Sequence, residues 1–525
     1  MRTDNHYRRG TDLKVFLGTH AAHAPDRPAI IMAGSSRVLT YGELDDSSKR
    51  LASSLHHLGL RRGDVIALLT DNAPEAFEVY WAAIRSGLYI TLVNRHLAPE
   101  EIAYILHDSE AKILFASAGV AELAQHLVGL IPDVWQCYSF GGSVTGFLPY
   151  DHLLALTTTP LPDQPCGAEL LYSSGTTGRP KGIKPPLPTR QVDEPGDSLV
   201  ELLQQVLHVT SDDVYLSPAP VYHAAPLKWC AVMHAIGGCV VMMERFDAEV
   251  ALEAIQRYEV SITQMVPTMF VRLLQLPEAV RERYDTSSLR LVVHAGAPCP
   301  PDVKEAMIDW WGPILLEYYG ATERHGMTMI NTQQWQSKRG SVGQSVQGVL
   351  HICDDAGGEL PQGQTGIIYF EQDSPAFIYH NDPEKTAAAR HPDHETWSTV
   401  GDIGYVDSDG FLFITDRKAF TIISGGVNIY PQEIENVLAL HPQILDVAVI
   451  GVPDSEMGQQ VKAVVQLRKG TEPSDDLGSE IISYVRDRLA HFKAPRTVEF
   501  VEELPRLETG KLAKGQLIER FSVAQ

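Results

Sequence analysis

Between residues 171 and 182 the sequence reads Leu-Tyr-Ser-Ser-Gly-Thr-Thr-Gly-Arg-Pro-Lys-Gly, a run rich in hydroxyl groups and glycine that follows an apolar segment. Glycines let backbone N–H groups close around phosphate oxygens, hydroxyl groups donate further hydrogen bonds, and a lysine adds positive charge. The usual P-loop pattern, G-x-x-x-x-G-K followed by Ser or Thr, does not fit, because Gly182 follows the lysine. The run predicts a polyphosphate-binding loop, with a plain flexible connection as the alternative. The candidate binding residues are Ser173, Ser174, Gly175, Thr176, Thr177, Gly178 and Lys181.

A second segment, Tyr319-Gly320-Ala321-Thr322-Glu323, places an aromatic ring and a carboxylate close together. An aromatic ring offers a purine a flat apolar face, and a hard cation that bridges phosphate oxygens needs a carboxylate ligand. Taken alone, Glu323 is more often a solvated surface acid.

These segments resemble the motifs of the adenylate-forming superfamily, which comprises acyl-CoA synthetases, firefly-type luciferases and the adenylation domains of peptide synthetases. The resemblance covers most of the chain and keeps the motif order. It implies that Tyr319 stacks on adenine, that Thr322 contacts phosphate and that Glu323 helps to hold Mg²⁺. It also implies that the turn after the strand 291–294 packs against adenine. The remaining nucleotide-binding candidates of these two segments are Gly296, Ala297, Pro298, Tyr318 and Gly320.

Two further motifs carry the resemblance into the acid and ribose sites. Pro220-Val-Tyr-His223 is similar to the aromatic and histidine motif beside the acyl-binding tunnel, which makes His223 a candidate catalytic residue. Thr399-Val400-Gly401-Asp402 resembles the family's T-G-D, with Val400 in place of threonine, and implies that Asp402 accepts hydrogen bonds from the ribose hydroxyls. Arg417 matches the arginine that contacts ribose. At the hinge position the chain has Ala419, where the family commonly has an aspartate or a lysine.

The C-terminal part carries the motifs of the second half-reaction and the proposed catalytic lysine. Ser424, Gly425 and Gly426 resemble the loop that enters the site for thiol transfer. Leu504-Pro-Arg-Leu-Glu-Thr-Gly-Lys511 resembles the motif with the catalytic lysine, although a lysine near a terminus is usually just solvated. The resemblance makes Lys511 the principal catalytic candidate.

The elements that must position these residues follow from hydrophobic periodicity. Apolar runs at 65–69, 89–92 and 113–116 predict strands that alternate with helices, and Thr40 and Glu43 form a capping pattern before one of these helices. After residue 416 shorter elements predict a small α+β part. The prediction is therefore an α/β protein with a large layered N-terminal domain, residues 1–416, and a small mobile α+β C-terminal domain, residues 417–525.

Bulk properties exclude some classes of partner. The formal net charge of −23 argues against nucleic acid binding, which depends on a dense cationic face. No apolar run approaches the length of a membrane span or marks a signal peptide, so a cytoplasmic protein is expected. The six cysteines include no C-x-x-C pair and are expected to be reduced. The sequence is compatible with a monomer and with an oligomer.

The resemblance implies an acyl-CoA synthetase that uses ATP, Mg²⁺ and coenzyme A to activate a carboxylic acid through an acyl-AMP intermediate, as in fatty acid metabolism. Lys511 would lie between two anions, the acid and the α-phosphate. Two alternatives stay open: an adenylation enzyme that loads a separate carrier protein, and a nucleotide-binding regulator without catalysis. Aromatic residues near the expected pocket favour a hydrophobic acid, which can be aliphatic, aryl or polycyclic.

Overall fold

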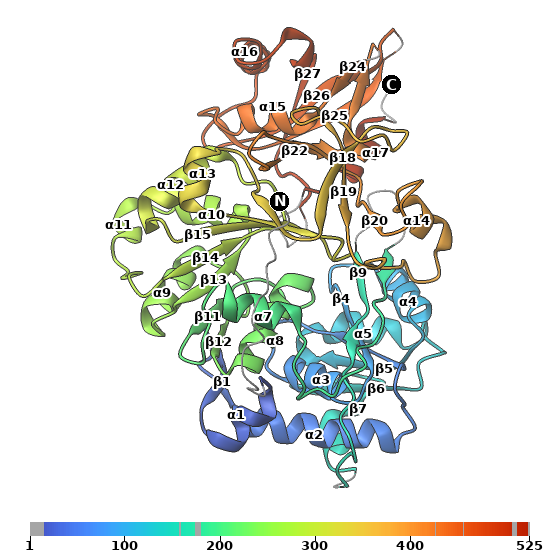
Figure 1. Ribbon diagram of the computed structural model, residues 1–525. Coiled ribbons are helices and arrows are strands. Elements are labelled where there is room, and N and C mark those ends of the chain that lie inside the picture. The colour runs from blue at the N-terminus through green and yellow to red at the C-terminus, as the bar shows by residue number, and fades with distance from the viewer. Residues whose placement is uncertain are drawn as a thin grey trace. The chain divides into compact units, whose positions relative to one another are not determined.

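The computed structural model describes residues 15–156, 159–173, 180–425, 427–454, 456–506 and 512–522 (Figure 1). The chain forms two compact units. Each unit is built from three stretches of sequence, so neither is a continuous segment. Unit 1 contains Met1–Leu171, Pro186–Arg245 and Tyr258–Ser261; unit 2 contains Tyr172–Pro185, Phe246–Arg257 and Ile262–Gln525.

The first sheet of unit 1 is parallel, with the strand order β7-β6-β5-β3-β4-β8. In its centre Leu68 lies opposite Leu92 on one side and Phe115 on the other. These central strands are buried along their whole length, as expected for a parallel sheet covered on both faces. The strands are β3 (Val65–Leu69), β4 (Tyr89–Val93), β5 (Ala111–Ser117), β6 (Gln136–Phe140), β7 (Leu148–Pro149) and β8 (Ala168–Glu169).

A second group of strands in unit 1 runs in the order β11-β12-β1-β2. The strands β11 (Val214–Ser217), β12 (Cys239–Met242) and β1 (Pro28–Met32) are parallel, and β2 (Val38–Thr40) is antiparallel to β1. Parallel strands have their carboxyl ends at one edge, where ligands of α/β proteins bind.

One helix of unit 1 begins where its capping pattern predicted. The Thr40 side chain accepts from the backbone N–H of Glu43 and the Glu43 carboxylate accepts from that of Thr40, so the predicted capping box is confirmed. The helices are α1 (Leu17–His23), α2 (Tyr41–His57), α3 (Glu75–Ile84), α4 (Pro99–Asp108), α5 (Ala121–Leu127), α6 (Tyr150–Leu154), α7 (Ser198–Gln205) and α8 (Ala224–Ile236).

Unit 2 contains another parallel group of strands, which two antiparallel strands extend. The order is β17-β16-β15-β14-β13, with β13, β14 and β15 parallel. The elements are β13 (Ile262–Met265), β14 (Leu291–His294), β15 (Leu315–Gly320), β16 (Met327–Asn331), β17 (Gln344–Gln347), α9 (Ala248–Arg257), α10 (Pro267–Leu274), α11 (Glu278–Arg281), α12 (Pro301–Trp311) and α13 (Thr332–Ser337).

The second sheet of unit 2 is antiparallel and has the order β18-β19-β21-β22, with β20 paired to β19. A separate two-stranded sheet pairs β9 (Leu171–Ser173) with β10 (Lys181–Ile183). The elements of the antiparallel sheet and its surroundings are β18 (Val349–Cys353), β19 (Gly366–Glu371), α14 (Pro383–Ala388), β20 (Trp397–Ser398), β21 (Asp402–Val406) and β22 (Leu412–Arg417).

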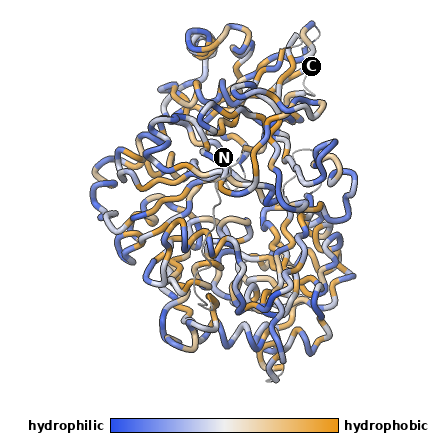
Figure 2. The backbone as a smooth tube through the Cα atoms, in the orientation of Figure 1, coloured by the Kyte–Doolittle hydropathy of each residue, from blue (hydrophilic) through white to orange (hydrophobic). Residues whose placement is uncertain are grey.

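The C-terminal part of unit 2 has hydrophobic clusters of its own, one around Ile434, Val449 and Ile481 and another around Ile450 and Leu517. Figure 2 shows the corresponding pattern, with orange along the strands and blue in many of the connecting turns. The elements are β23 (Ile422–Ser424), β24 (Val427–Ile429), α15 (Pro431–Leu438), β25 (Ile444–Asp454), β26 (Gly458–Leu467), α16 (Asp475–Arg486), β27 (Thr497–Val501) and α17 (Lys514–Ser522).

The predicted α/β class, with a large N-terminal and a smaller C-terminal part, is confirmed. The domain boundary between residues 416 and 417 stays a prediction. None of the helices in the described stretches combines the length and the apolar character that crossing a bilayer demands. All six cysteines are free thiols.

Candidate active site

Asp402 and Arg417 face each other across the antiparallel pair of β21 and β22. Asp402 Oδ1 lies 2.9 Å from Arg417 Nε, and Asp402 Oδ2 accepts a hydrogen bond of 2.7 Å from the Tyr319 hydroxyl. Burial and the neighbouring carboxylate raise the pKa of Tyr319, so its hydroxyl keeps its proton and donates. A carboxylate offers about four lone-pair sites, which leaves Asp402 with acceptor capacity for two ribose hydroxyls.

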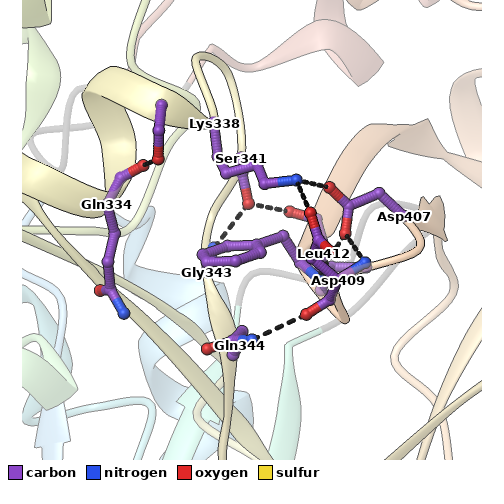
Figure 3. A network of polar contacts seen from close by, with 10 residues as sticks. Gln334, Lys338, Ser341, Gly343, Gln344, Asp407, Asp409 and Leu412 are labelled. Carbon is purple, nitrogen blue, oxygen red and sulfur yellow. Dashed lines mark hydrogen bonds and ion pairs between the residues drawn. The ribbon is translucent and has the colours of Figure 1, made fainter.

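The far turn of this hairpin is fixed by a polar network (Figure 3). Lys338 Nζ lies 2.7 Å from Asp407 Oδ2 and 2.5 Å from Asp409 Oδ2, and the Ser341 hydroxyl donates to the carbonyl oxygen of Leu412 at 2.8 Å. Gly410 has a φ of 82°, the left-handed conformation that a tight Asp-Gly turn requires. The hairpin that carries Asp402 and Arg417 is thus held at the end opposite to them.

Glu323 lies beside Tyr379 and the exit of the predicted phosphate loop. Glu323 Oε1 accepts a hydrogen bond of 2.9 Å from the Tyr379 hydroxyl, and the Lys181 ammonium group lies 5.1 Å from the centre of the same ring. The backbone of β10 is fixed there as well, because His380 N–H donates to the Gly182 carbonyl oxygen at 2.7 Å. The structure therefore brings together Lys181 and Glu323, two sequence candidates that are far apart in the chain.

Tyr379 is a site residue that the sequence reasoning missed. It occupies no motif used above, and its only signal is an aromatic residue in a polar turn just before the Pro383 helix start. Burial, and next the charge of Glu323, raise the pKa of Tyr379 well above its usual value, so the phenol stays a hydrogen-bond donor to this carboxylate.

The turn after Glu323 reverses the chain. Arg324 has a φ of 53°, the left-handed region, and the Gln372 side-chain amide donates to the carbonyl oxygens of Arg324 and His325 at 3.1 and 2.8 Å. These bonds fix the backbone next to Glu323 and Thr322. Tyr318 and Gly320, also candidates, are in β15, where they lie opposite Met329 and Met327 of β16.

The predicted adenine turn follows β14 directly. Gly296 has a φ of 85°, which favours glycine, and Ala297 and Pro298 continue the turn toward α12. The position of this turn at the carboxyl end of a parallel strand agrees with the sequence prediction, while its contact with adenine stays a prediction.

Several candidates of the phosphate loop and of the catalytic tail lie outside the described residues. Ser173 ends β9 and Lys181 begins β10, so the described chain includes both ends of the phosphate loop. The candidates outside the described residues are Ser174, Gly175, Thr176, Thr177, Gly178, Gly426 and Lys511.

The chain on either side of residues 507–511 is anchored. Arg506 makes two contacts with Asp446, at 2.5 and 2.6 Å, and forms an isolated antiparallel bridge with Leu512. Lys514 Nζ lies 2.8 Å from Glu435 Oε1, and both side chains are nearly buried. Ser424 and Gly425 lie in the β23–β24 hairpin, where Gly425 has a φ of 57°.

His223 belongs to unit 1, in the loop between β11 and α8. It is the N-cap residue of α8, and Leu227 N–H donates to its carbonyl oxygen at 3.2 Å. The Tyr222 and His223 rings lie 4.4 Å apart between centres, and the Tyr222 side chain is buried.

Comparisons with known proteins extend over most of the chain. Residues 17–380 match the AMP-binding enzyme family, and residues 433–511 match the AMP-binding enzyme C-terminal domain. The fatty acid–acyl-carrier-protein ligase ScoC of Streptomyces coeruleorubidus is 31% identical over 96% of this chain and 95% of that protein. A feruloyl-CoA synthase from Streptomyces sp. is 33% identical over 95% of this chain and 97% of that protein. The solved structure of ATP-bound MatB from Rhodopseudomonas palustris has a TM-score of 0.80 and 28% identity, covering 97% of this chain and 99% of that one.

Proposed function

This chain belongs to the AMP-binding enzyme family, in the acyl-CoA synthetase branch of the adenylate-forming superfamily, and from that membership we propose that it converts a hydrophobic carboxylic acid to its coenzyme A thioester. The observation that carries the proposal is the cluster of Asp402, Tyr319 and Arg417, together with the Glu323, Tyr379 and Lys181 group. Together these groups provide acceptors for ribose, a carboxylate for a metal and an ammonium group for phosphate.

Magnesium fits this site as an ion that arrives with the nucleotide. Mg²⁺ is usually held by one or two carboxylates together with substrate phosphates and waters, and Glu323 supplies one buried carboxylate. In the described part of the chain, no group of three or more His, Cys, Asp or Glu side chains could hold a metal ion. When bound, the ion would neutralise charge on the phosphate oxygens.

The first half-reaction joins two anions. A carboxylate oxygen of the acid attacks the α-phosphorus of ATP, an O–P bond forms, and the bond to the leaving pyrophosphate breaks. Because both partners are negative, their approach in a low-dielectric site is costly unless a cation lies between them. We assign that cation to Lys511, and the anchoring of the chain at Arg506 and Lys514 supports its delivery to a fixed place.

The second half-reaction is thiol transfer. The sulfur of coenzyme A attacks the carbonyl carbon of the acyl-adenylate, a C–S bond forms, the C–O bond to AMP breaks, and the thiol proton is released. The Ser424–Gly425 hairpin is the proposed entry for the thiol. A separate C-terminal domain from residue 417 would allow this change of partner, and this boundary is part of the proposal.

The test begins with pyrophosphate release from the wild-type protein over a panel of aliphatic, aryl and polycyclic acids. Release that depends on one class of acid supports the proposal, and no release with any acid contradicts it. Lys511→Ala is expected to lose adenylation by several orders of magnitude while ATP binding survives, because the lysine acts mainly in the transition state. A Lys511→Ala variant that releases pyrophosphate at the wild-type rate would refute the assignment.

A carrier protein is the second candidate for the acceptor, because one relative is named as an acyl-carrier-protein ligase. Mass spectrometry of reactions with free coenzyme A separates the two candidates. A thioester of coenzyme A supports the proposal, whereas an acyl-adenylate that accumulates until a phosphopantetheinylated carrier protein is added supports the alternative.

A further inference from the structure

Asn72 makes three hydrogen bonds with two segments that are far from it in sequence. Its side-chain Nδ2 donates to the carbonyl oxygen of Met243 at 2.7 Å and to that of Ala219 at 3.2 Å. Its Oδ1 accepts from the backbone N–H of Val221 at 2.9 Å. One buried amide therefore uses both of its ends on the backbone.

The residues that Asn72 joins lie just past the carboxyl ends of three parallel strands. Asn72 follows β3 of the first sheet of unit 1, Ala219 and Val221 follow β11, and Met243 follows β12. The side chain thus fastens a loop of one strand group of unit 1 to the other. Ligands of α/β proteins bind at such strand ends. The hydrogen bonds of Asn72 therefore fix the backbone of a region where a ligand is expected to bind.

Burial gives these bonds their weight. Asn72 is 7% exposed, Ala219 5%, Met243 1% and Val221 0%, so water has little access to replace a lost partner. An unpaired buried amide or carbonyl costs the full desolvation of that group, whereas a well-packed apolar side chain would have cost nothing of the kind. We therefore infer that an amide is needed here to hold the backbone of these segments in place.

The loop that Asn72 holds carries the acid-side candidates. Besides the bonds from Asn72, the turn at residues 219–223 is closed by a hydrogen bond of 3.2 Å from His223 N–H to the carbonyl oxygen of Pro220. Val221 and Ala219 lie on either side of Pro220, and Tyr222 and His223 follow directly. Fixing the backbone at residues 219 and 221 therefore fixes the positions from which the side chains of Tyr222 and His223 extend.

We propose that Asn72 is a positioning residue that sets the acid-binding loop, residues 219–223, and thereby the affinity and selectivity for the acid. This inference rests on the proposed function, in which the loop lines the acid site. The nucleotide-side residues Asp402, Tyr319 and Glu323 all belong to unit 2, whereas every group in this tie belongs to unit 1. Loss of the amide should therefore affect the acid and spare ATP.

The experiment compares the Michaelis constants of Asn72→Ala for acid and for ATP. The expected result is a KM for the acid raised about tenfold or more, since up to three buried bonds are lost, with the KM for ATP changed less than about twofold. Asn72→Ser, which retains one hydroxyl, should lie between the wild type and Asn72→Ala. The preference among acids of different bulk should become weaker in the same order.

Tyr41→Phe is the matched control. Its hydroxyl is also buried in unit 1 and donates to a backbone carbonyl, that of Gly238, at 2.7 Å. This variant should lose thermal stability and leave both Michaelis constants unchanged. If Asn72→Ala fails to fold, Asn72→Ser carries the same comparison.

Three outcomes would overturn the inference: an unchanged acid KM in the folded variants, an equal rise of both Michaelis constants, or the same rise in Tyr41→Phe. Failure of the proposed function is a separate result, since in that case the wild-type protein itself releases no pyrophosphate with any acid.

Discussion

The nucleotide-side cluster of unit 2 and the acid-binding loop of unit 1 are organised in different ways. In unit 2 the candidate side chains contact each other: Asp402 pairs with Arg417 and Tyr319, and Glu323 pairs with Tyr379. In unit 1 the loop is held through its backbone by Asn72. Interlocked side chains allow little change, which suits a constant ligand such as ATP. A loop fixed through its backbone can change its side chains without losing its position, which suits an acid that differs between relatives.

Among the described residues of these two regions, the largest effect should come from removing the shared partner of the unit 2 cluster. Asp402→Ala deletes two charge-assisted or strong hydrogen bonds and leaves the guanidinium of Arg417 without its carboxylate. Bonds to charged groups are worth about 1.5–3 kcal/mol each, so kcat/KM for ATP should fall about a hundredfold or more. Steady-state pyrophosphate release at varied ATP measures this, with the KM for acid expected to stay near that of the wild type.

Lys338→Gln provides the control for this variant. It removes the ion pairs at the far turn of the same hairpin, shown in Figure 3, and leaves Asp402 and Arg417 in place. Asp409 in the second of these pairs is exposed, and ion pairs near the surface contribute little. A loss of ATP turnover in Lys338→Gln comparable to that in Asp402→Ala would show that the loss comes from misfolding of the hairpin and not from a missing contact with ribose.

A second, smaller effect is expected at the metal-side pair. Glu323→Gln keeps an oxygen that accepts from Tyr379 but removes the negative charge, so the magnesium concentration for half-maximal rate should rise about tenfold. A magnesium titration of pyrophosphate release checks it. Tyr379→Phe sharpens the comparison, because the Glu323 carboxylate keeps its charge and loses only the hydrogen bond that orients it. A larger shift in the magnesium requirement than that of Glu323→Gln would contradict the assignment of Glu323 as the metal ligand.

The sequence predicted the fold and the polar motifs better than the contacts between them. Continuous apolar runs such as Val65–Leu69 identify buried parallel strands because burial on both faces leaves no polar alternation. The start of helix α16 at Asp475 is set by its cap, because the Ser474 hydroxyl accepts from the backbone N–H of Leu477. Asn72 and Tyr379 could not be found, because each acts through partners separated by more than fifty residues and neither belongs to a motif used in the prediction.

The anchor next to Lys511 gives a third prediction, with a still smaller effect on catalysis. Lys514→Met removes the partner of the buried Glu435, whose carboxylate also accepts from the backbone N–H of Val449. Breaking a buried pair costs about 3–5 kcal/mol of stability. Adenylation should fall several-fold, while thioester formation from supplied acyl-adenylate should be unchanged, because Lys511 is assigned to the first half-reaction only.

Lys462→Met is the matched control for Lys514→Met. Lys462 also pairs with a glutamate, Glu499 at 3.2 Å, and lies over the ring of Phe521, but it is in the middle of β26. Its loss should affect the two half-reactions equally. If Lys514→Met also lowers both half-reactions by the same factor, the pair stabilises the C-terminal part in general and does not position the catalytic segment.

The smallest effect on catalysis is expected from a titrating group whose influence on stability should be confined to unit 1. Glu78 of α3 is buried and accepts a hydrogen bond of 2.8 Å from the Tyr150 hydroxyl, and burial raises its pKa to about 7 from an ordinary 4.5. Between about pH 4.5 and about pH 7 the folded protein therefore holds a proton that the unfolded chain has lost. The stability that this group contributes is fully present below the lower value and is lost as the pH rises through the upper one.

Glu78→Gln removes this contribution, because the amide does not titrate. Across that interval the free energy of unfolding of the wild type should fall, relative to that of the variant, by up to about 3 kcal/mol. Denaturant unfolding at a series of pH values measures the difference. Amide hydrogen exchange locates it: protection of α3 should depend on pH in the wild type and much less in the variant, while protection of β21 and β22 should respond alike in both proteins. Parallel pH profiles for the two proteins would show that Glu78 is already ionised when folded, and the pH dependence would then have to come from groups that the wild type and the variant have in common.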